Sequence, residues 1–341
     1  MRLRLCLSLA ALAGAACLFP APAAPAPDGP GVVIKGSKDV LEFRVGKEMV
    51  TRYHVGESLA KPYFWPLTAS NGAAVTRAWP MEPAGEGDSS DHVHQKSAWF
   101  CHGDVSAEGL EAGTAGKGID FWSEEKGHGR IVCVHVGEPK NANDHASVVT
   151  KNEWRTATGT KVLDETRTIS LYALGESRLL VLDIDLKASV AAITFGDTKE
   201  GSMGVRVNDV IREAPPKGAK GGAGRLTNAD GKSGEKAVWG QHSKWCDYSG
   251  TLDGKEAGIA IFDDPANKAA AAWHSRGYGL MAANPFGRDK SGFPATKGQT
   301  DLVKVPKGER LNLRYGILVH PGDVKEGKVA EAFEKFVKLK G

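Results

Sequence analysis

The fold is decided by a stretch in the middle of the chain, Val162-Leu163-Asp164-Glu165-Thr166-Arg167-Thr168-Ile169-Ser170-Leu171-Tyr172-Ala173-Leu174, followed closely by Leu179-Leu180-Val181-Leu182-Asp183-Ile184-Asp185-Leu186. Both runs are rich in aliphatic and β-branched residues, which favour extended backbone. The turn residue Gly175 lies between them. We therefore predict two long strands and a fold dominated by β-structure.

Shorter runs of the same kind recur on both sides of this stretch. Residues 40–45 alternate apolar and polar side chains, and Gly46-Lys47 forms a turn before a partner strand over residues 51–55. Residues 61–67 contain two prolines, which predicts an edge strand because proline cannot donate a ladder hydrogen bond. The other predicted strands cover residues 130–136, 147–154, 190–195, 203–207, 258–262, 279–282 and 311–319. This set is larger than a simple seven-stranded sandwich uses.

Helical periodicity is confined to the C-terminal end of the chain. Apolar residues recur there at helical spacing, with lysines and glutamates between them, at Val329, Ala332, Phe333, Phe336 and Val337. This pattern predicts one packing helix. The segment 215–236 is rich in Gly, Lys and Ala and predicts a surface loop. The residues thus indicate an all-β fold with a C-terminal helix, in one large domain or two smaller ones.

The first residues have the organisation of a secretory signal peptide. Arg2 and Arg4 precede an apolar segment over residues 5–19, and Ala21-Pro22-Ala23 is a cleavage site of the A-x-A type. We predict a signal peptide over residues 1–23, followed by a Pro/Ala-rich spacer over residues 24–38. The alternative is a lipoprotein anchored at Cys17. Either leader predicts an exported protein, periplasmic or extracellular.

Charge and cysteine content exclude several classes of protein. Loss of Arg2 and Arg4 with the leader would change the formal net charge from +3 to +1. This balance argues against a nucleic-acid partner, which requires a basic face. Outside the leader, no segment is apolar enough to predict a transmembrane helix. Cys101, Cys133 and Cys246 then remain, which allows at most one disulfide plus a free thiol and leaves the pairing open.

The densest group of reactive side chains is the run Asp91-His92-Val93-His94-Gln95-Lys96-Ser97-Ala98-Trp99-Phe100-Cys101-His102-Gly103-Asp104. In an extended strand, residues two apart share one face, so we expect His92 and His94 to point at one spot. Converging imidazoles and carboxylates can move protons near neutral pH or bind a divalent metal. A metal site of two histidines and one carboxylate would use His92, His94 and Asp91, with Glu200 as the alternative carboxylate.

Three further clusters combine charged residues with, in two cases, large aromatic residues. They contain Glu200 and Arg206 (residues 197–206), Asp247 (residues 239–250), and His274, Arg276 and Tyr278 (residues 273–287). Aromatic faces beside hydrogen-bonding groups suit sugar rings, whose C–H faces stack while the hydroxyls pair with polar side chains. His128 lies in a polar loop and is expected to have no functional role.

Together, these motifs resemble one protein family. The matching segments are Lys61-Pro62-Tyr63-Phe64-Trp65-Pro66-Leu67, Val75-Thr76-Arg77, Asp91-His92-x-His94, Trp99-Phe100-x-His102-Gly103-Asp104-Val105, Asp120-Phe121-Trp122, Lys199-Glu200-Gly201, residues 245–250 and residues 273–287. They are similar to the DUF6807 family, whose members often carry the label "methane oxygenase PmoA", and the resemblance covers residues 40–322. The oxygenase label fits poorly, because membrane methane monooxygenase subunits are built from transmembrane helices.

The resemblance implies a large antiparallel β-sandwich like the galactose mutarotase-like supersandwich, in a single domain over residues 39–341. It also implies an exported protein whose partner is a carbohydrate or a sugar-derived small molecule. The family usually has a histidine at the position of Gln95, an arginine at that of Lys96 and an acid at that of Gly277. Roles carried by those side chains are therefore not transferred to this chain.

Three hypotheses about function result. In the first, a carbohydrate-active hydrolase, lyase or isomerase moves protons with His92, His94, Glu200 and His274. Its substrate-binding residues would be Trp99, His102, Arg206, Asp247, Arg276 and Tyr278. The second hypothesis is a metal-dependent oxygenase or hydrolase that uses the histidine and carboxylate set. The third is a non-catalytic carbohydrate-binding protein with aromatic platforms at Trp65, Trp99, Trp122, Trp245 and Trp273.

Overall fold

The computed structural model describes residues 31–110, 117–215 and 222–339. The predicted signal peptide over residues 1–23, with the alternative lipid anchor at Cys17, lies outside the described residues. So do residues 216–221 of the predicted loop.

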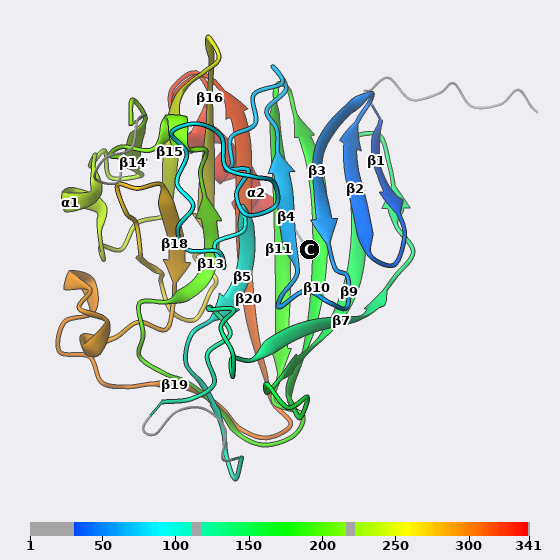
Figure 1. Ribbon diagram of the computed structural model, residues 1–341, viewed down its shortest axis with the longest axis vertical. Helices are drawn as coiled ribbons and strands as arrows, with labels where there is room; N and C mark the ends of the chain where they lie inside the picture. The colour runs from blue at the N-terminus through cyan, green and yellow to red at the C-terminus, as the bar shows by residue number, and fades with distance from the viewer. Residues whose placement is uncertain (1–30, 111–116, 216–221, 340–341) are drawn as a thin grey trace, which may run out of the picture.

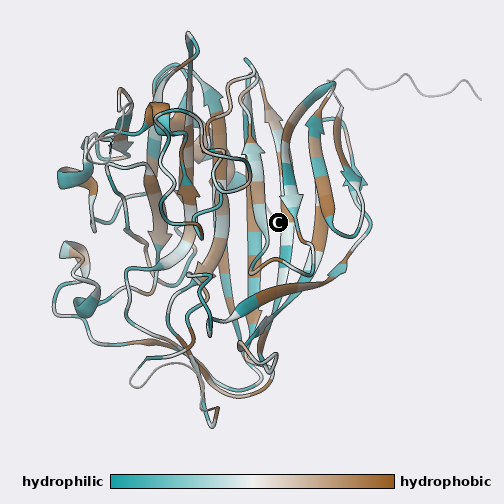
Figure 2. Cartoon of the chain, viewed as in Figure 1, coloured by the Kyte–Doolittle hydropathy of each residue, from teal (hydrophilic) through white to brown (hydrophobic). Residues whose placement is uncertain are grey.

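The two strands predicted from the central stretch are present and pair with each other. β10 (Lys161–Leu174) and β11 (Ser177–Lys187) form an antiparallel hairpin with continuous register from Asp164↔Lys187 to Leu174↔Ser177. Hydrophilic and hydrophobic residues alternate along β10 (Figure 2) because one of its faces packs in the core. This hairpin forms the middle of the larger sheet.

The larger sheet extends from the hairpin in both directions. Among the described residues it has nine strands, and the path through eight of them is β14 (Arg225–Asn228), β15 (Trp245–Leu252), β16 (Lys255–Asp263), β20 (Arg310–Pro321), β11, β10, β9 (His145–Arg155) and β7 (Arg130–Val136). The short β8 (Lys140–Asn141) also pairs with β9. β14 lies within the segment predicted to be a loop. Leu226 and Asn228 of this strand are buried, so the segment is part of the fold.

The second sheet has eight strands in the described part of the chain. Their order is β1 (Val32–Gly36), β2 (Val40–Val45), β3 (Glu48–His54), β4 (Tyr63–Leu67), β5 (Ala98–His102), β13 (Gly201–Arg206), β18 (Leu280–Asn284) and β17 (Ala272–Trp273). These strands run from right to left in Figure 1. β1 lies within the predicted spacer, where Val32 and Ile34 alternate with more exposed residues and are buried.

The edge position predicted for residues 61–67 is wrong. β4 pairs with β3 on one side and with β5 on the other. Its pairing with β5 covers only Tyr63 and Phe64. Pro66 lies beyond these pairs, so an interior strand can accommodate it without losing a ladder hydrogen bond to β5.

Three short strands and a few helical turns complete the described fold. The strands β19 (Val303–Val305), β12 (Ile193–Phe195) and β6 (Val105–Ala107) form a small antiparallel sheet. The helical segments are α1 (Glu235–Val238), α2 (Val329–Lys338), η1 (Asp209–Ile211), η2 (Asp289–Ser291) and η3 (Pro294–Thr296). α2 packs Phe333 and Phe336 against Phe262 of β16. The predicted antiparallel β-sandwich with a C-terminal packing helix is therefore confirmed.

The two large sheets pack face to face through aromatic side chains. Phe100 of β5 lies 6.1 Å from both Trp154 of β9 and Tyr315 of β20, measured between ring centroids. Because side chains alternate along a strand, the neighbouring Trp99 points to the opposite, outer face of the eight-stranded sheet. A cavity lined by several of the predicted site residues lies over that outer face.

A buried ion pair lies between the sheets. Arg167 Nε of β10 donates to Glu165 Oε1 at 2.6 Å, and both side chains are fully buried. Arg167 Nη1 also donates to the Tyr53 hydroxyl of β3 at 2.8 Å, which links the two sheets. Trp154 Nε1 donates to the other oxygen of Glu165 at 2.7 Å. These hydrogen bonds offset the cost of burying two charges.

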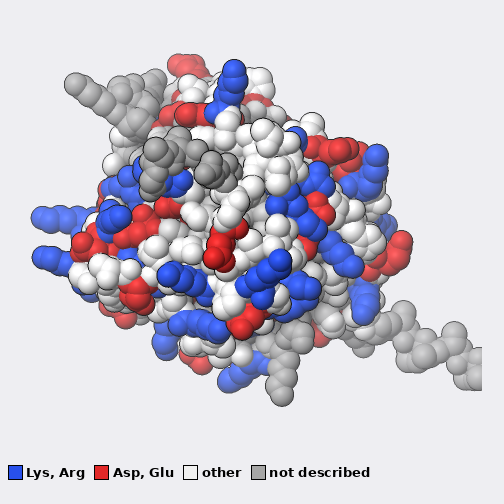
Figure 3. Space-filling model, turned by 90° about the horizontal axis from the view of Figure 1, so that it is seen from below, with Lys and Arg blue, Asp and Glu red and all other residues white. Residues whose placement is uncertain are grey.

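The described surface carries charges of both signs (Figure 3), and the three described cysteines are unpaired. Basic and acidic side chains are interspersed over the face shown in Figure 3, with no extended basic patch on that face. No helix within the described ranges is long and apolar enough to cross a membrane. Cys101, Cys133 and Cys246 are all free thiols. Burial raises the pKa of Cys101 to about 12 and also raises the pKa of the other two.

We predict that Arg167→Met will lower the free energy of unfolding by about 3–5 kcal/mol, because it leaves the Glu165 carboxylate buried without its cation. Urea denaturation measures the change. The matched control is Arg310→Ala, which removes the partly exposed ion pair between Arg310 and Asp185 and should cost less than about 1 kcal/mol. Equal losses of unfolding free energy in the two variants would show that the buried ion pair contributes no more to stability than the exposed one.

Candidate active site

Three of the four sequence clusters converge on one cavity. It has a volume of about 660 Å³ and lies over β5, β13 and β18, which are neighbours in the sheet. The segments next to these strands therefore meet although they are far apart in the sequence. The lining residues are His92, His94, Gln95, Asp120, Trp122, Ser123, Glu125, His128, Lys199, Glu200, Glu235, His274, Arg276 and Tyr278.

His92 and His94 both line the cavity, but they do not lie on a strand as predicted. They belong to a turn before β5, closed by the hydrogen bond from Gln95 N to His92 O at 2.9 Å. His92 adopts a left-handed φ of 44°, which an extended strand does not allow. The exposed Val93 between them has no core to pack against, so the alternating pattern does not produce a strand here. The two rings lie 5.7 Å apart.

Trp99 lies beneath the cavity, below Trp122. The two indoles contact edge to face with 5.1 Å between their centroids. Gly204 is opposite Trp99 on β13. A Cβ at this glycine would lie 2.7 Å from the Trp99 ring, so the absence of a side chain makes room for the indole. Trp99 is completely buried, and the prediction that it contacts substrate is wrong; Trp122 is the tryptophan that lines the cavity.

Glu200 and His274 face each other across a short gap. Glu200 Oε2 lies 4.0 Å from His274 Nδ1. Arg276 Nε donates to His274 Nε2 at 3.4 Å, which assigns the remaining ring proton to Nδ1. This buried Nδ1 lies near the Lys199 backbone but makes no hydrogen bond of ordinary geometry within the described residues. A single oxygen atom to one side of the line between Nδ1 and the carboxylate, about 2.8 Å from each, could hydrogen-bond to both groups.

Burial shifts the pKa values of His274, His94 and Glu200. It lowers the pKa of His274 to about 3, together with the charges of Arg276 and Lys199. It also lowers the pKa of His94 to about 4, together with the charge of Lys61. Burial raises the pKa of Glu200, against the opposing effect of Lys199. The cavity thus combines neutral imidazoles with a carboxyl group that retains its proton more readily than usual.

Arg206 supports the cavity from behind and does not line it. Its guanidinium lies 4.6 Å from the centre of the Tyr278 ring, and Tyr278 stacks on His92 with 5.3 Å between centroids. Arg206 also donates to Gln95 Oε1 at 2.6 Å and to Asp91 Oδ1 at 3.1 Å. Because Arg206 is fully buried under Tyr278, the predicted contact between Arg206 and substrate is wrong.

The predicted metal ligands are not arranged around a common point. Asp91 Oδ1 accepts from Arg77 and Arg206, and Asp91 Oδ2 lies 3.0 Å from His92 Nδ1. Burial opposes ionisation of Asp91, but the hydrogen bond with His92 and the charge of Arg206 hold its pKa well below the usual range. Nowhere in the described ranges do three His, Cys, Asp or Glu side chains lie together in a metal-binding arrangement. The set His92, His94 and Asp91 therefore does not fit a metal ion.

His102 and Asp247 also lie away from the cavity, so their predicted roles in substrate binding are wrong. His102 is buried behind β13, where its Nε2 contacts Gly196 O at 2.9 Å. Asp247 is buried in the nine-stranded sheet and accepts from His320 Nε2 at 2.8 Å. Both belong to sequence clusters that combine aromatic and charged residues. Strand alternation on β5 turns His102 to the face opposite Trp99, and Asp247 lies on β15 in the other sheet.

The aromatic platforms proposed for a binding protein are largely inaccessible. Relative exposure is 0% for Trp99 and Trp273, 2% for Trp122 and 6% for Trp245. Trp65 is half-buried. A flat stacking surface built from these five tryptophans is therefore absent.

Sequence reasoning missed several cavity residues. Asp120, Ser123, Glu125 and His128 come from the loop before β7, and His128 Nδ1 lies 3.8 Å from Asp120 Oδ2. The Asp120-Phe121-Trp122 motif in the sequence could have identified this loop as part of the candidate site. Glu235 gave no such signal, because it lies in the segment predicted to be a surface loop.

Glu235 reaches the cavity from α1. Its Oε1 accepts from Arg276 Nη1 at 3.0 Å, and its Oε2 accepts from Gly277 N at 2.6 Å. A Cβ at Gly277 would lie 3.1 Å from this same Oε2. The carboxylate of Glu235 therefore occupies the space beside a position where the family usually has an acid.

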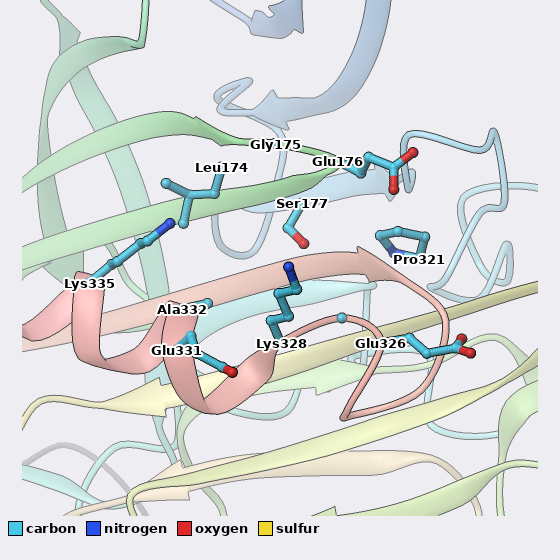
Figure 4. Close-up of a pocket in the computed structure, with 11 residues that line it drawn as sticks. Leu174, Gly175, Glu176, Ser177, Pro321, Glu326, Lys328, Glu331, Ala332 and Lys335 are labelled. Atoms are coloured by element: carbon cyan, nitrogen blue, oxygen red, sulfur yellow. The ribbon is translucent and has the colours of Figure 1, made fainter.

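A second pocket, of about 340 Å³, lies between α2 and the β10–β11 turn (Figure 4). Lys328 and Ser177 point toward one another in it, and Glu331 lies on the exposed side of α2. None of the predicted site residues lines this pocket.

The depressed pKa values of His94 and His274 predict a specific dependence of stability on pH. Below pH 6.5 the unfolded chain binds protons at these histidines while the folded chain does not, so the free energy of unfolding should fall as the pH decreases from 6.5 toward 4. The slope is at most about 1.4 kcal/mol per pH unit for each histidine. We expect the free energy of unfolding, measured by urea denaturation between pH 7.5 and 4.5, to fall less steeply in the double variant His94→Gln/His274→Asn than in the parent protein. The exposed control His135→Gln should follow the parent; a parallel fall for all three proteins contradicts the assignment.

Comparison with solved structures finds only distant likenesses. A GH36 α-galactosidase, AgaB, from Geobacillus stearothermophilus matches with 9% identity and a TM-score of 0.46, over 87% of this chain and 42% of that chain. An α-galactosidase from Lactobacillus brevis matches with 10% identity and a TM-score of 0.41, over 86% and 40%. A galactose mutarotase related enzyme from Lactobacillus acidophilus has 7% identity and a TM-score of 0.31, over 85% and 97%.

This chain therefore spans about two fifths of the length of the α-galactosidases it matches. No curated protein sequence matches it. The model of the family DUF6807, described as a family of unknown function, matches residues 40–334. This range covers most of the chain and includes every residue that lines the cavity, and the chain belongs to the DUF6807 family.

Proposed function

We propose that this protein binds a carbohydrate or sugar derivative in the cavity and acts on it by proton transfer at Glu200 and His274. The observation that carries the proposal is the 4.0 Å gap between Glu200 Oε2 and His274 Nδ1. One sugar hydroxyl beside this pair, on the cavity side, would receive a hydrogen bond from His274 and donate one to Glu200. It would satisfy the buried Nδ1.

The composition of the cavity wall supports a sugar ligand. Trp122 and Tyr278 contribute apolar ring edges to the wall, while the carboxylates, imidazoles and Ser123 offer donors and acceptors. Sugar rings use both kinds of contact at once. A volume of about 660 Å³ is within the usual range of small-molecule sites. The secretory leader expected over residues 1–23 is consistent with a carbohydrate met outside the cytoplasm.

The protonation states support acid–base chemistry. A carboxyl group whose pKa is raised by burial holds its proton more readily, which suits it to accept a proton and return it. Glu200 is therefore the proposed acid–base residue. His274, held neutral with its proton on Nδ1, stabilises negative charge on the ligand oxygen by hydrogen bonding, and His92 and His94 complete the wall on the other side. Hydrolysis, elimination and isomerisation of a sugar all need such a proton transfer.

The test starts from a screen of oligosaccharides and sugar derivatives with the purified protein, followed by NMR detection of products. With the substrate so found, Glu200→Gln should lower kcat about 100- to 10,000-fold, the range for loss of a general acid or base. His274→Asn should also lower kcat, while thermal shift should show that both variants still fold and bind ligand.

Glu331→Gln, on the exposed face of α2, is the matched control and should retain full turnover. Unchanged turnover in both cavity variants would refute the assigned chemistry. Ligand binding without turnover by the parent protein would instead identify a binding protein that uses the same cavity.

A further inference from the structure

The cavity has an uneven distribution of charge. Apart from histidines, its described lining contains four carboxylates but only two cations, Lys199 and Arg276. Lys199 Nζ lies 3.6 Å from Glu200 Oε1 and is partly exposed. Arg276 is the group that could bind a ligand carboxylate in bidentate fashion. What Arg276 contacts therefore bears directly on which sugars the cavity accepts.

Arg276 is engaged on several sides by this chain's own residues. Glu235 Oε1 accepts from its Nη1 at 3.0 Å, and His274 Nε2 accepts from its Nε at 3.4 Å. The guanidinium lies over the Trp239 ring, 5.0 Å from its centre. The carboxylate of Glu235 thus stands where a ligand carboxylate would pair with the guanidinium.

Glu235 is itself firmly held. Its Oε2 accepts from Gly277 N at 2.6 Å, and its own backbone N donates to Glu213 Oε2 at 2.8 Å. The carboxylate is therefore fixed by two donors, Arg276 and the Gly277 amide, and a ligand anion would have to displace it. The same anion would also face the carboxylates of Asp120, Glu125 and Glu200, which line the cavity.

We propose that Glu235 is a specificity-determining residue: by pairing with Arg276 it directs the cavity toward uncharged sugars and against sugar carboxylates such as uronates. The inference rests on the proposed function, since it assumes that the cavity binds sugars. In this proposal α1 supplies the carboxylate that neutralises Arg276, and the substrate is an uncharged sugar.

Glu235→Gln tests the masking directly. A glutamine carbonyl can still accept from Gly277 N, but it cannot neutralise Arg276. NMR titration with sodium acetate, in low-chloride buffer, should show binding at least about tenfold tighter than to the parent protein. The control Glu331→Gln removes one negative charge from the exposed side of α2, outside this cavity, and should leave acetate binding unchanged. In the double variant Glu235→Gln/Arg276→Gln the gain should disappear.

Two results would overturn the masking role. One is unchanged acetate binding in a folded Glu235→Gln protein, with folding checked by circular dichroism. The other is an equal gain in Glu331→Gln, which would reduce the effect to the net charge of the protein.

Titration with D-glucose, D-galactose and their uronates separates this inference from the proposed function. Preference of the parent protein for the neutral sugars, shifted toward uronates in Glu235→Gln, is the expected result. Preference of the parent protein for uronates overturns the inference but leaves sugar binding intact. A third outcome is that Glu235→Gln binds acetate more tightly, as expected, but the parent protein binds none of these sugars and no member of the oligosaccharide screen. In that case the proposed function fails, and the assignment of a neutral sugar as substrate fails with it.

Discussion

The buried pairing of Arg167 with Glu165 and Tyr53 is the contact on which the arrangement of the two sheets depends. A guanidinium in the core has few satisfactory positions, because each of its donors left without a partner costs free energy. Here β10 supplies the carboxylate and β3, on the opposite sheet, supplies the hydroxyl. Hydrophobic packing alone tolerates small shifts between sheets. Directional hydrogen bonds from one buried cation tolerate far fewer, so the pair fixes how the sheets lie against each other.

The candidate site uses the same principle on the outer face of the sheet. Buried cations lie behind the cavity and hold the loops that form it: Arg206 supports Tyr278 and Asp91, and Lys61 joins Glu124 to the backbone of Trp122. These groups do not touch the cavity, yet they set the positions of the side chains that do. The rigid strands β5, β13 and β18 carry the loops, and proximity of strands brings together residues distant in sequence.

Local sequence patterns were sufficient for most of the sandwich and for part of the site. Alternation identified β2, runs of aliphatic and β-branched residues identified β10 and β11, and helical spacing identified α2. β5 is buried on both faces, since loops cover its outer side, and so it shows no alternation. His92 and His94 have the two-residue spacing expected of a strand, but the segment forms a turn because Val93 between them has no core to pack against.

The remaining site residues depend on contacts that no local pattern records. Glu235 meets Arg276 across 41 residues of sequence, and only the three-dimensional fold brings α1 to the cavity. Conversely, His102, Arg206 and Asp247 have the chemistry of site residues but lie on the wrong face or in the wrong sheet. Residue type predicted the kind of chemistry, whereas burial and topology decided which residues could take part.

The three free, separated cysteines have a consequence for how the chain can mature. Thiolate is the form that attacks disulfides, and burial raises the pKa of all three thiols, so little thiolate exists near neutral pH. The native contacts of the described domain include no disulfide among these three cysteines, so forming them needs no oxidant. Once the domain is folded, the buried thiols are also poor partners for thiol–disulfide exchange with other proteins.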